Sequence, residues 1–166
     1  MVHRLVSVML ALGLCLAVVR PVFAQDSPFA IGGGVGYVFD YHSDAVVVNA
    51  VARIPVNFKR SWLKPNVVTP RFEYFPTYNG FQVDLDALWD VPVVEGTPVR
   101  PYLGLGIGLA HSDGTTSYLF NFDAGVRYKK PSWKHEFALE THYSAGLDFD
   151  NSMALNFIVF FPIKGR

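Results

Sequence analysis

The chain has a single cysteine, Cys15, which lies in an apolar N-terminal segment. The rest of the chain therefore has no disulfide, no thiolate metal site and no cysteine nucleophile. Four histidines remain beyond that segment, and none of them has the sequence spacing of a metal-binding pair. We expect no metal ion and no other cofactor.

Beyond residue 24 the chain also lacks any apolar run of 18 residues, which excludes a membrane-spanning helix there. The chain has no excess of positive or negative charge, because 14 basic residues balance 14 acidic ones. This balance argues against nucleic acid as a partner. Glycine-rich stretches at residues 32–36 and 104–108 continue as alternating strand patterns, so we do not interpret them as phosphate-binding loops.

Residues 1–24 are predicted to be a removable secretory signal peptide. His3 and Arg4 form a short basic region, an apolar run follows, and Val22 and Ala24 suit the positions before a cleavage site. The apolar run is shorter than the roughly 20 residues of a membrane-spanning helix, so we favour a signal over an anchor. Residues 25–166 then form one exported domain.

Apolar and polar or very small side chains alternate residue by residue through this domain. The pattern occurs in eight segments, at about residues 29–39, 45–56, 67–75, 81–91, 99–109, 116–128, 133–145 and 153–163. Each segment has about the 9–11 residues that a tilted strand needs to cross a bilayer. An even number of such strands can close on itself. The sequence therefore predicts an all-β fold, an eight-stranded antiparallel up-and-down transmembrane β-barrel.

Charged side chains of both signs fall on the inward face of the predicted strands. They are Arg53, Arg71, Arg100, Arg127, Lys134, Glu73, Asp84, Asp86, Asp90, Asp123, Glu136 and Glu140. An eight-stranded barrel is just wide enough for side chains to fill it, and buried charges need oppositely charged partners. We expect an ion-paired plug rather than an ion path.

Aromatic residues are expected at both ends of the barrel, where side chains with a polar tip suit a membrane–water interface. One end would carry Trp62, Trp89, Tyr128 and Trp133, and the other Tyr37, Tyr41, Tyr78, Tyr118 and Tyr143.

Only one group of residues suggests catalysis. Glu140, His142 and Ser144 are two residues apart and would share one face of a strand. An acid, a base and a hydroxyl in this order suit a serine nucleophile activated by a histidine. The alternative is that all three belong to the polar filling of the barrel.

The chain resembles the small eight-stranded outer-membrane barrels, including the barrel domain of outer-membrane protein A. The similar stretches are residues 101–108, Pro-Tyr-Leu-Gly-Leu-Gly-Ile-Gly, and residues 123–128, Asp-Ala-Gly-Val-Arg-Tyr. This resemblance extends over nearly all of the exported domain and implies the fold, but fold alone does not determine activity.

The C-terminal third is also similar to the lipid A 3-O-deacylases, or acyloxyacyl hydrolases, which cut an ester-linked acyl chain from lipopolysaccharide. The similar stretches include His142-Tyr143-Ser144 and residues 145–147. The resemblance implies that His142 is the base and Ser144 the nucleophile, with Glu140 the acid nearest to them. The family usually has an asparagine after the serine, where this chain has Ala145.

We favour an integral outer-membrane protein with a non-enzymatic structural role in the envelope. A lipid A deacylase is the first alternative, and a small pore or a carrier of an apolar ligand is the second. The expected partners are outer-membrane lipids, lipopolysaccharide and, during insertion, the barrel-assembly machinery.

Overall fold

The computed structural model describes residues 29–40, 44–56, 65–94, 96–130, 132–147 and 151–163. The predicted signal peptide, residues 1–24, lies outside this part, as do Tyr41 and Trp62. The strands are β1 (Ala30–Asp40), β2 (Ala45–Pro55), β3 (Val67–Phe75), β4 (Gly80–Asp90), β5 (Val99–Ser112), β6 (Thr115–Tyr128), β7 (Glu136–Gly146) and β8 (Ser152–Pro162). Within the described ranges, no helix has the length and apolar character of a membrane span.

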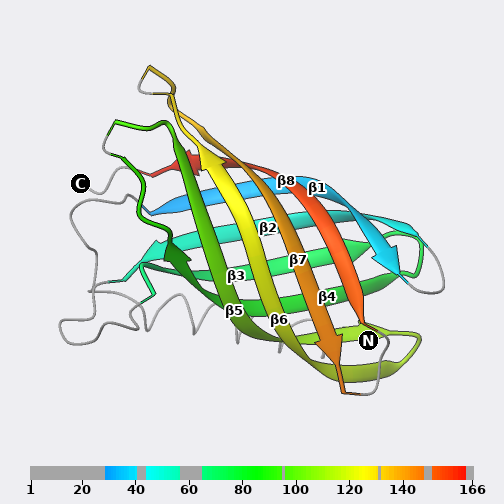
Figure 1. Cartoon of the computed structure of the whole chain (residues 1–166). Helices are drawn as coiled ribbons and strands as arrows, with labels where there is room; N and C mark the ends of the chain where they lie inside the picture. Colours follow the sequence, from blue (N-terminus) through cyan, green and yellow to red (C-terminus); the bar gives the residue numbers. More distant parts are fainter. Residues whose placement is uncertain are drawn as a thin grey trace.

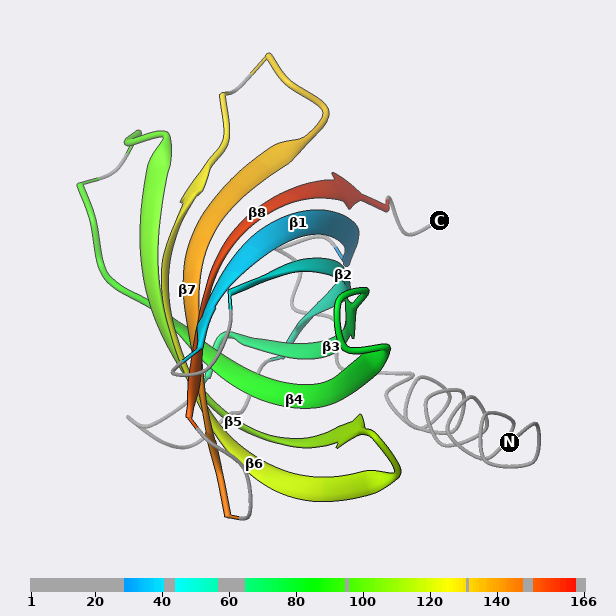
Figure 2. The same ribbon diagram turned by 90° about the vertical axis from the view of Figure 1, so that its right-hand side faces the viewer.

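The eight strands close into one barrel, in which each strand pairs antiparallel with its neighbours in the chain and β8 pairs with β1 (Figures 1 and 2). This confirms the predicted fold. β1 begins and β8 ends at the same edge of the barrel, since Ala30 is opposite Pro162. We call this edge the terminal edge and the other one the far edge.

The hairpin between β5 and β6 is tighter than the sequence pattern suggests. β5 continues to Ser112, which pairs with Thr115. Asp113 and Gly114 both have positive φ angles, 48° and 81°, as the two central residues of a type I′ turn require. The sequence Asp-Gly is well suited to this turn, because glycine carries no Cβ and aspartate tolerates a left-handed backbone.

The alternation in the sequence becomes an apolar outside and a polar inside. Leu105 and Ile107 on β5 are 58% and 61% exposed, whereas Arg71 and Asp123 are 1% and 0% exposed. The residues that the barrel buries include most of the predicted lumenal charges: Arg53, Arg71, Arg127, Glu73, Asp84, Asp86, Asp123, Glu136 and Glu140. The predicted division into faces is therefore confirmed along the strands.

The inward prediction was wrong for Lys134, which precedes the start of β7 and is exposed. Alternation determines a side chain's direction only where strand pairing holds the backbone, and Lys134 lies outside the paired strand. Arg100, the second residue of β5, is opposite the buried Arg127 and so is on the inward face, but it is exposed because it lies at the mouth of the barrel.

Glycines on β5 make room for the charged interior. Gly104, Gly106 and Gly108 all face the lumen. Each is the cross-strand neighbour of a buried aspartate: Asp123, Asp86 and Asp84, respectively. A Cβ added to any of the three would overlap that aspartate's carboxylate. The missing side chains thus leave the space that the carboxylates fill.

Apolar side chains close the interior on both sides of its polar centre. Near the terminal edge they form two clusters, Ala30, Val51, Ala138, Ile158 and Phe160 in one and Val67, Leu88 and Tyr102 in the other. Towards the far edge Val38, Ala45, Val47 and Ala154 form a third, with Phe75 and Tyr78 packed against it. The described lumen is therefore packed with side chains throughout.

Candidate functional site: the polar interior

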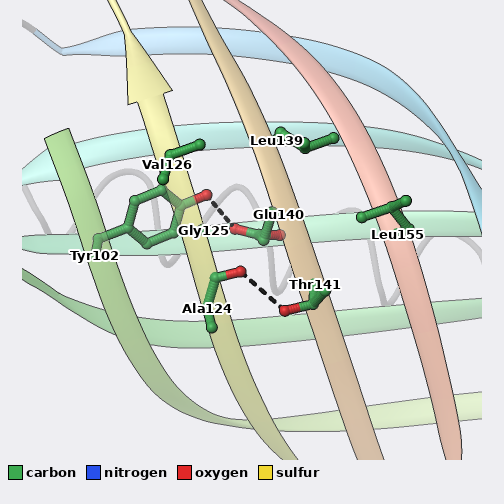
Figure 3. A pocket seen from close by; sticks show the side chains of 8 residues that line it. All are labelled: Tyr102, Ala124, Gly125, Val126, Leu139, Glu140, Thr141 and Leu155. Atoms are coloured by element: carbon green, nitrogen blue, oxygen red, sulfur yellow. Dashed lines mark hydrogen bonds between the residues drawn. The ribbon is translucent and has the colours of Figure 1, made fainter. Parts of the chain in front are cut away.

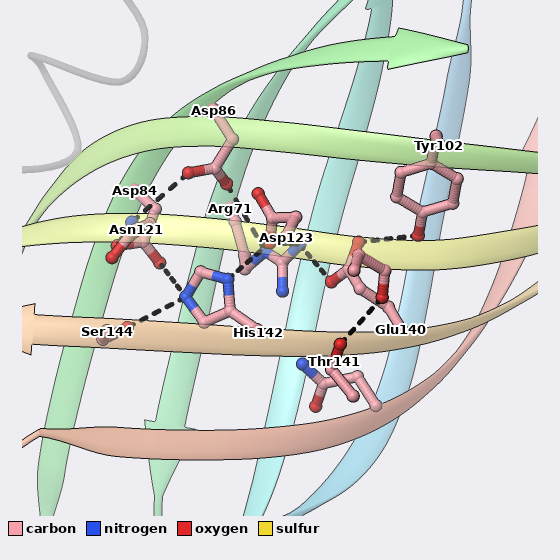
Figure 4. Close-up of polar contacts among 12 residues, drawn as sticks. Arg71, Asp84, Asp86, Tyr102, Asn121, Asp123, Glu140, Thr141, His142 and Ser144 are labelled. Carbon is pink, nitrogen blue, oxygen red and sulfur yellow. Dashed lines mark hydrogen bonds and ion pairs between the residues drawn. The ribbon is translucent and has the colours of Figure 1, made fainter. Parts of the chain in front are cut away.

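The guanidinium of Arg71 on β3 lies at the centre of the polar interior (Figure 4). It pairs with Glu140 on the opposite wall. Its nitrogens also lie 3.4 Å from Glu73, 3.5 Å from Asp123 and 3.8 Å from Asp86. One cation is therefore shared by carboxylates from β3, β4, β6 and β7, which ties distant walls of the barrel together.

Two more ion pairs cross the interior nearer the terminal edge. Arg53 on β2 pairs with Glu136 on β7, and Arg127 on β6 pairs with Asp90 on β4. The guanidinium groups of Arg53 and Arg127 also lie 5.0 and 5.2 Å from the ring centroids of Phe160 and Tyr102. Buried charges of this kind are tolerated when they are paired, which agrees with the predicted plug.

His142 and Ser144 lie next to each other on the inner face of β7. Ser144 Oγ is 3.1 Å from His142 Nε2, and His142 Nδ1 is 2.6 Å from Asp123 Oδ1. The amide nitrogen of Gln82 donates to Ser144 Oγ at 3.1 Å and to Asp84 Oδ1 at 2.9 Å. In such an arrangement the imidazole can take the proton of the hydroxyl, while the carboxylate orients the imidazole.

The structure brings His142 and Ser144 together as the spacing suggests, but it corrects the identity of their acid. Asp123 on β6, the cross-strand neighbour of His142, holds the imidazole. Glu140 instead pairs with Arg71 and accepts a hydrogen bond of 2.7 Å from the hydroxyl of Tyr102. Sequence spacing could not identify Asp123, because its contact depends on the β6–β7 register.

The location of this trio limits its chemistry. His142 and Ser144 are 2% and 3% exposed and face the lumen. A lipid on the outside of the barrel is separated from Ser144 by the barrel wall. In this conformation the three side chains act as part of the packed interior.

Two overlapping groups in the interior have metal-ligand residue types within 4.8 Å of one another: Glu73, Asp84 and His142, and Asp86, Asp123 and His142. Protein donors already occupy both. Gln82 Nε2 lies 3.2 Å from His142 Nε2 beside Asp84, and Arg71 lies between Asp86 and Asp123. Sequence spacing shows neither group, because their members come from different strands.

A shallow groove lies on the outer wall, over β6, β7 and β8 (Figure 3). It has a volume of about 300 Å³. Its outward-facing lining is Ala124, Val126, Leu139, Thr141 and Leu155, and the inward-facing Tyr102 and Glu140 complete the lining together with Gly125. The hydroxyl of Thr141 donates to the carbonyl of Ala124 at 2.9 Å, so the one polar side chain of the outward-facing lining is satisfied within the wall. The groove forms where Ala124 and Gly125, which have small or no side chains, leave space between their larger neighbours.

A closed eight-stranded up-and-down barrel with an apolar exterior and a filled polar interior is the architecture of the small outer-membrane barrels. No protein-family model and no curated protein matches the sequence. Among solved structures, the chain is similar to Neisserial surface protein A, with a TM-score of 0.57 and 14% identity over 81% of this chain and 97% of that one.

It is also similar to the N-terminal β-barrel domain of OprF from Pseudomonas aeruginosa, with a TM-score of 0.57 and 16% identity. That match covers 79% of this chain and 96% of the OprF domain. At these identities both likenesses describe the fold.

Proposed function

We propose that this protein is an integral outer-membrane β-barrel with a non-enzymatic, structural role in the bacterial envelope. The observation that carries the proposal is the band of exposed apolar side chains that runs round the barrel, formed by large hydrophobic residues on the strands. A soluble protein rarely exposes an apolar surface of this extent. In a bilayer the same surface replaces contacts with water by contacts with lipid.

The aromatic side chains at both edges support this placement. Tyr128 and Trp133 are exposed near the terminal edge, and Tyr37, Tyr118 and Tyr143 lie towards the far edge. Aromatic residues at these two levels suit the two membrane–water interfaces. The predicted signal peptide, residues 1–24, supplies the export that such a location needs. Outer-membrane lipids, lipopolysaccharide and the barrel-assembly machinery are the partners proposed with it.

The filled interior favours a structural role over that of a pore. Three buried arginines pair with carboxylates across the lumen, and apolar clusters lie on either side of the central network. An ion would have to displace several of these contacts to pass.

One observation favours the deacylase alternative, which is the contact of Asp123, His142 and Ser144. The burial of Ser144 disfavours it, because a lipid ester has to come within bonding distance of the serine oxygen. We therefore keep the structural role as the conclusion.

Charge placed in the middle of the apolar band tests the membrane location. Leu105→Arg puts a cation at mid-strand on the outer face of β5, and Val94→Arg puts the same residue in the exposed connection between β4 and β5. An arginine at the bilayer midplane destabilises a membrane barrel by about 2–4 kcal/mol. The measurement is urea unfolding in phospholipid vesicles, followed by the gel mobility difference between heated and unheated samples.

We expect Leu105→Arg to lower the stability by that amount and Val94→Arg to leave it nearly unchanged. If Leu105→Arg leaves the barrel as stable as the wild type in vesicles, the outer face of β5 is not in contact with lipid and the proposal fails.

A further inference from the structure

The turn between β6 and β7, at the terminal edge, is strongly basic. Residues 129–135 contain Lys129, Lys130 and Lys134 and no acidic residue, and the three lysines are exposed. The turns at the far edge have the opposite charge in their described parts, with exposed Asp44 and Asp113. A cluster of cations at one membrane interface attracts the negative headgroups of anionic lipids.

An aromatic ladder connects these lysines to the apolar wall. Lys130 Nζ lies 5.9 Å from the ring centroid of Trp133. Trp133 in turn packs edge-on against Tyr128 at 5.8 Å and Phe137 at 5.4 Å. The charge of Lys130 therefore lies next to the interfacial aromatic residues.

The groove described above lies on the outer wall of the same strands, further from the terminal edge than this ladder. Val126 and Leu139 are its members nearest to the terminal edge, three residues from Lys129 and from Glu136. At about 3.3 Å per residue, Ala124 is roughly 16 Å along the strand from Lys129, and a strand tilt of about 40° makes this roughly 12 Å of membrane depth. That distance exceeds the roughly 5–7 Å of a headgroup layer, so the groove opens into the hydrocarbon region.

The groove suits a hydrocarbon chain because its outward-facing polar group is already satisfied. Thr141 donates to Ala124, and the remaining outward-facing lining is apolar. The two inward-facing polar residues of the lining are also satisfied, because the hydroxyl of Tyr102 donates to the carboxylate of Glu140 at 2.7 Å. Gly125 is at its base. A side chain at this position would collide with the ring of Tyr102 inside the barrel. The barrel wall therefore consists of backbone alone at Gly125.

We propose that the outer face of β6, β7 and β8 binds an anionic phospholipid, with its phosphate on the lysines of the β6–β7 turn and one acyl chain in the groove. This site rests on the proposed function, since it requires the barrel to be in a membrane. The juxtaposition of a cationic turn, an aromatic ladder and an apolar groove on the same strands carries the assignment.

Native mass spectrometry tests the site. Barrel recovered from the outer membrane and exchanged into a neutral detergent would be titrated separately with phosphatidylglycerol, phosphatidylcholine and lipid A. We expect phosphatidylglycerol to bind tightest, with a preference over phosphatidylcholine of about five-fold or more, the effect of about 1 kcal/mol from even one lysine.

Two variants and two matched controls locate the binding. A Lys129→Gln, Lys130→Gln, Lys134→Gln triple variant removes the charge, and its control is Arg100→Gln, an exposed arginine at the same edge on β5. Ala124→Phe fills the groove, and its control is Ala87→Phe, on the outer face of β4. We expect both site variants to lose the preference for phosphatidylglycerol and both controls to keep it.

Three outcomes would overturn the site: equal affinity for the two phospholipids, tighter binding of lipid A than of phosphatidylglycerol, or unchanged preference in either site variant. Each leaves the proposed function standing if the barrel still folds into neutral vesicles and shifts its gel mobility on heating. Failure to fold into vesicles of any composition would count against the proposed function itself.

Discussion

Arg71 and Glu140 form an ion pair across the full width of the barrel, from β3 to β7 on the opposite wall. Arg71 also lies close to Glu73, Asp86 and Asp123. The four carboxylates share this one guanidinium, and Asp123 and Glu140 also bond to His142 and Tyr102. This makes Arg71 the residue on which the packed interior depends most.

We expect Arg71→Met to destabilise the barrel by about 3–5 kcal/mol, the usual effect of removing one partner from a buried ion pair. The stem of methionine fills part of the same space, so the loss is that of charge rather than volume. Urea unfolding in neutral vesicles measures it. Arg100→Met is the control, because Arg100 is exposed at the barrel mouth. Equal stabilities of the two variants would mean that the central carboxylates do not need Arg71.

A second prediction about the interior concerns Gly106 on β5, which leaves room for the carboxylate of Asp86. Gly106→Ala would push a methyl group into the carboxylate of Asp86, whereas Gly33→Ala on β1 meets only the carbonyl of Asn49 at 3.6 Å, an ordinary contact. We expect Gly106→Ala to lower the free energy of unfolding by about 1–3 kcal/mol, as overpacking does. Gly33→Ala should leave it unchanged or raise it by up to about 1 kcal/mol.

The same unfolding assay compares the two glycine variants, since both are glycine-to-alanine changes within a strand. If Gly106→Ala is no more destabilising than Gly33→Ala, the carboxylate of Asp86 does not fill the space on the lumenal side of Gly106.

The sequence predicts the inward and outward faces well, because a strand's two-residue period is encoded locally. Alternation alone predicts lumenal positions for Asp84 and Asp86 on β4 and for His142 and Ser144 on β7, and the structure buries all four. Alternation does not hold beyond the paired segments, which is why it is wrong for Lys134, before the start of β7.

The partners of these inward residues could not be predicted in the same way. Glu140 is two residues from His142 in the sequence, yet Asp123 from the next strand holds the imidazole. The register between β6 and β7, together with the closure of the barrel, decides which side chains meet. Contacts such as that of Gln82 with Ser144, between β4 and β7, involve strands that are not neighbours in the sheet.

The packed lumen predicts the absence of steady ion conduction. In planar bilayers we expect the folded protein to give no sustained single-channel current, because Arg53, Arg71 and Arg127 each pair with a carboxylate inside the barrel and apolar clusters lie on either side of the central network. Heat-modifiable gel mobility of the same sample would show that closed barrels were added. A steady current from such a sample would favour the pore alternative.

Lipid A composition separates the structural role from the deacylase alternative. The wild type and Ser144→Ala would each be expressed in an outer membrane, and the lipid A would be analysed by mass spectrometry. We expect identical lipid A from both, because Ser144 faces the packed lumen and is 3% exposed. Ser144→Ala should lower the stability by about 1–3 kcal/mol, since Gln82 loses an acceptor in a buried site. Loss of one hydroxyacyl chain with the wild type alone would instead make Asp123, His142 and Ser144 a working hydrolase. Because that reaction needs the serine oxygen at the ester carbonyl, such a result would also require the barrel wall beside β7 to open in the membrane.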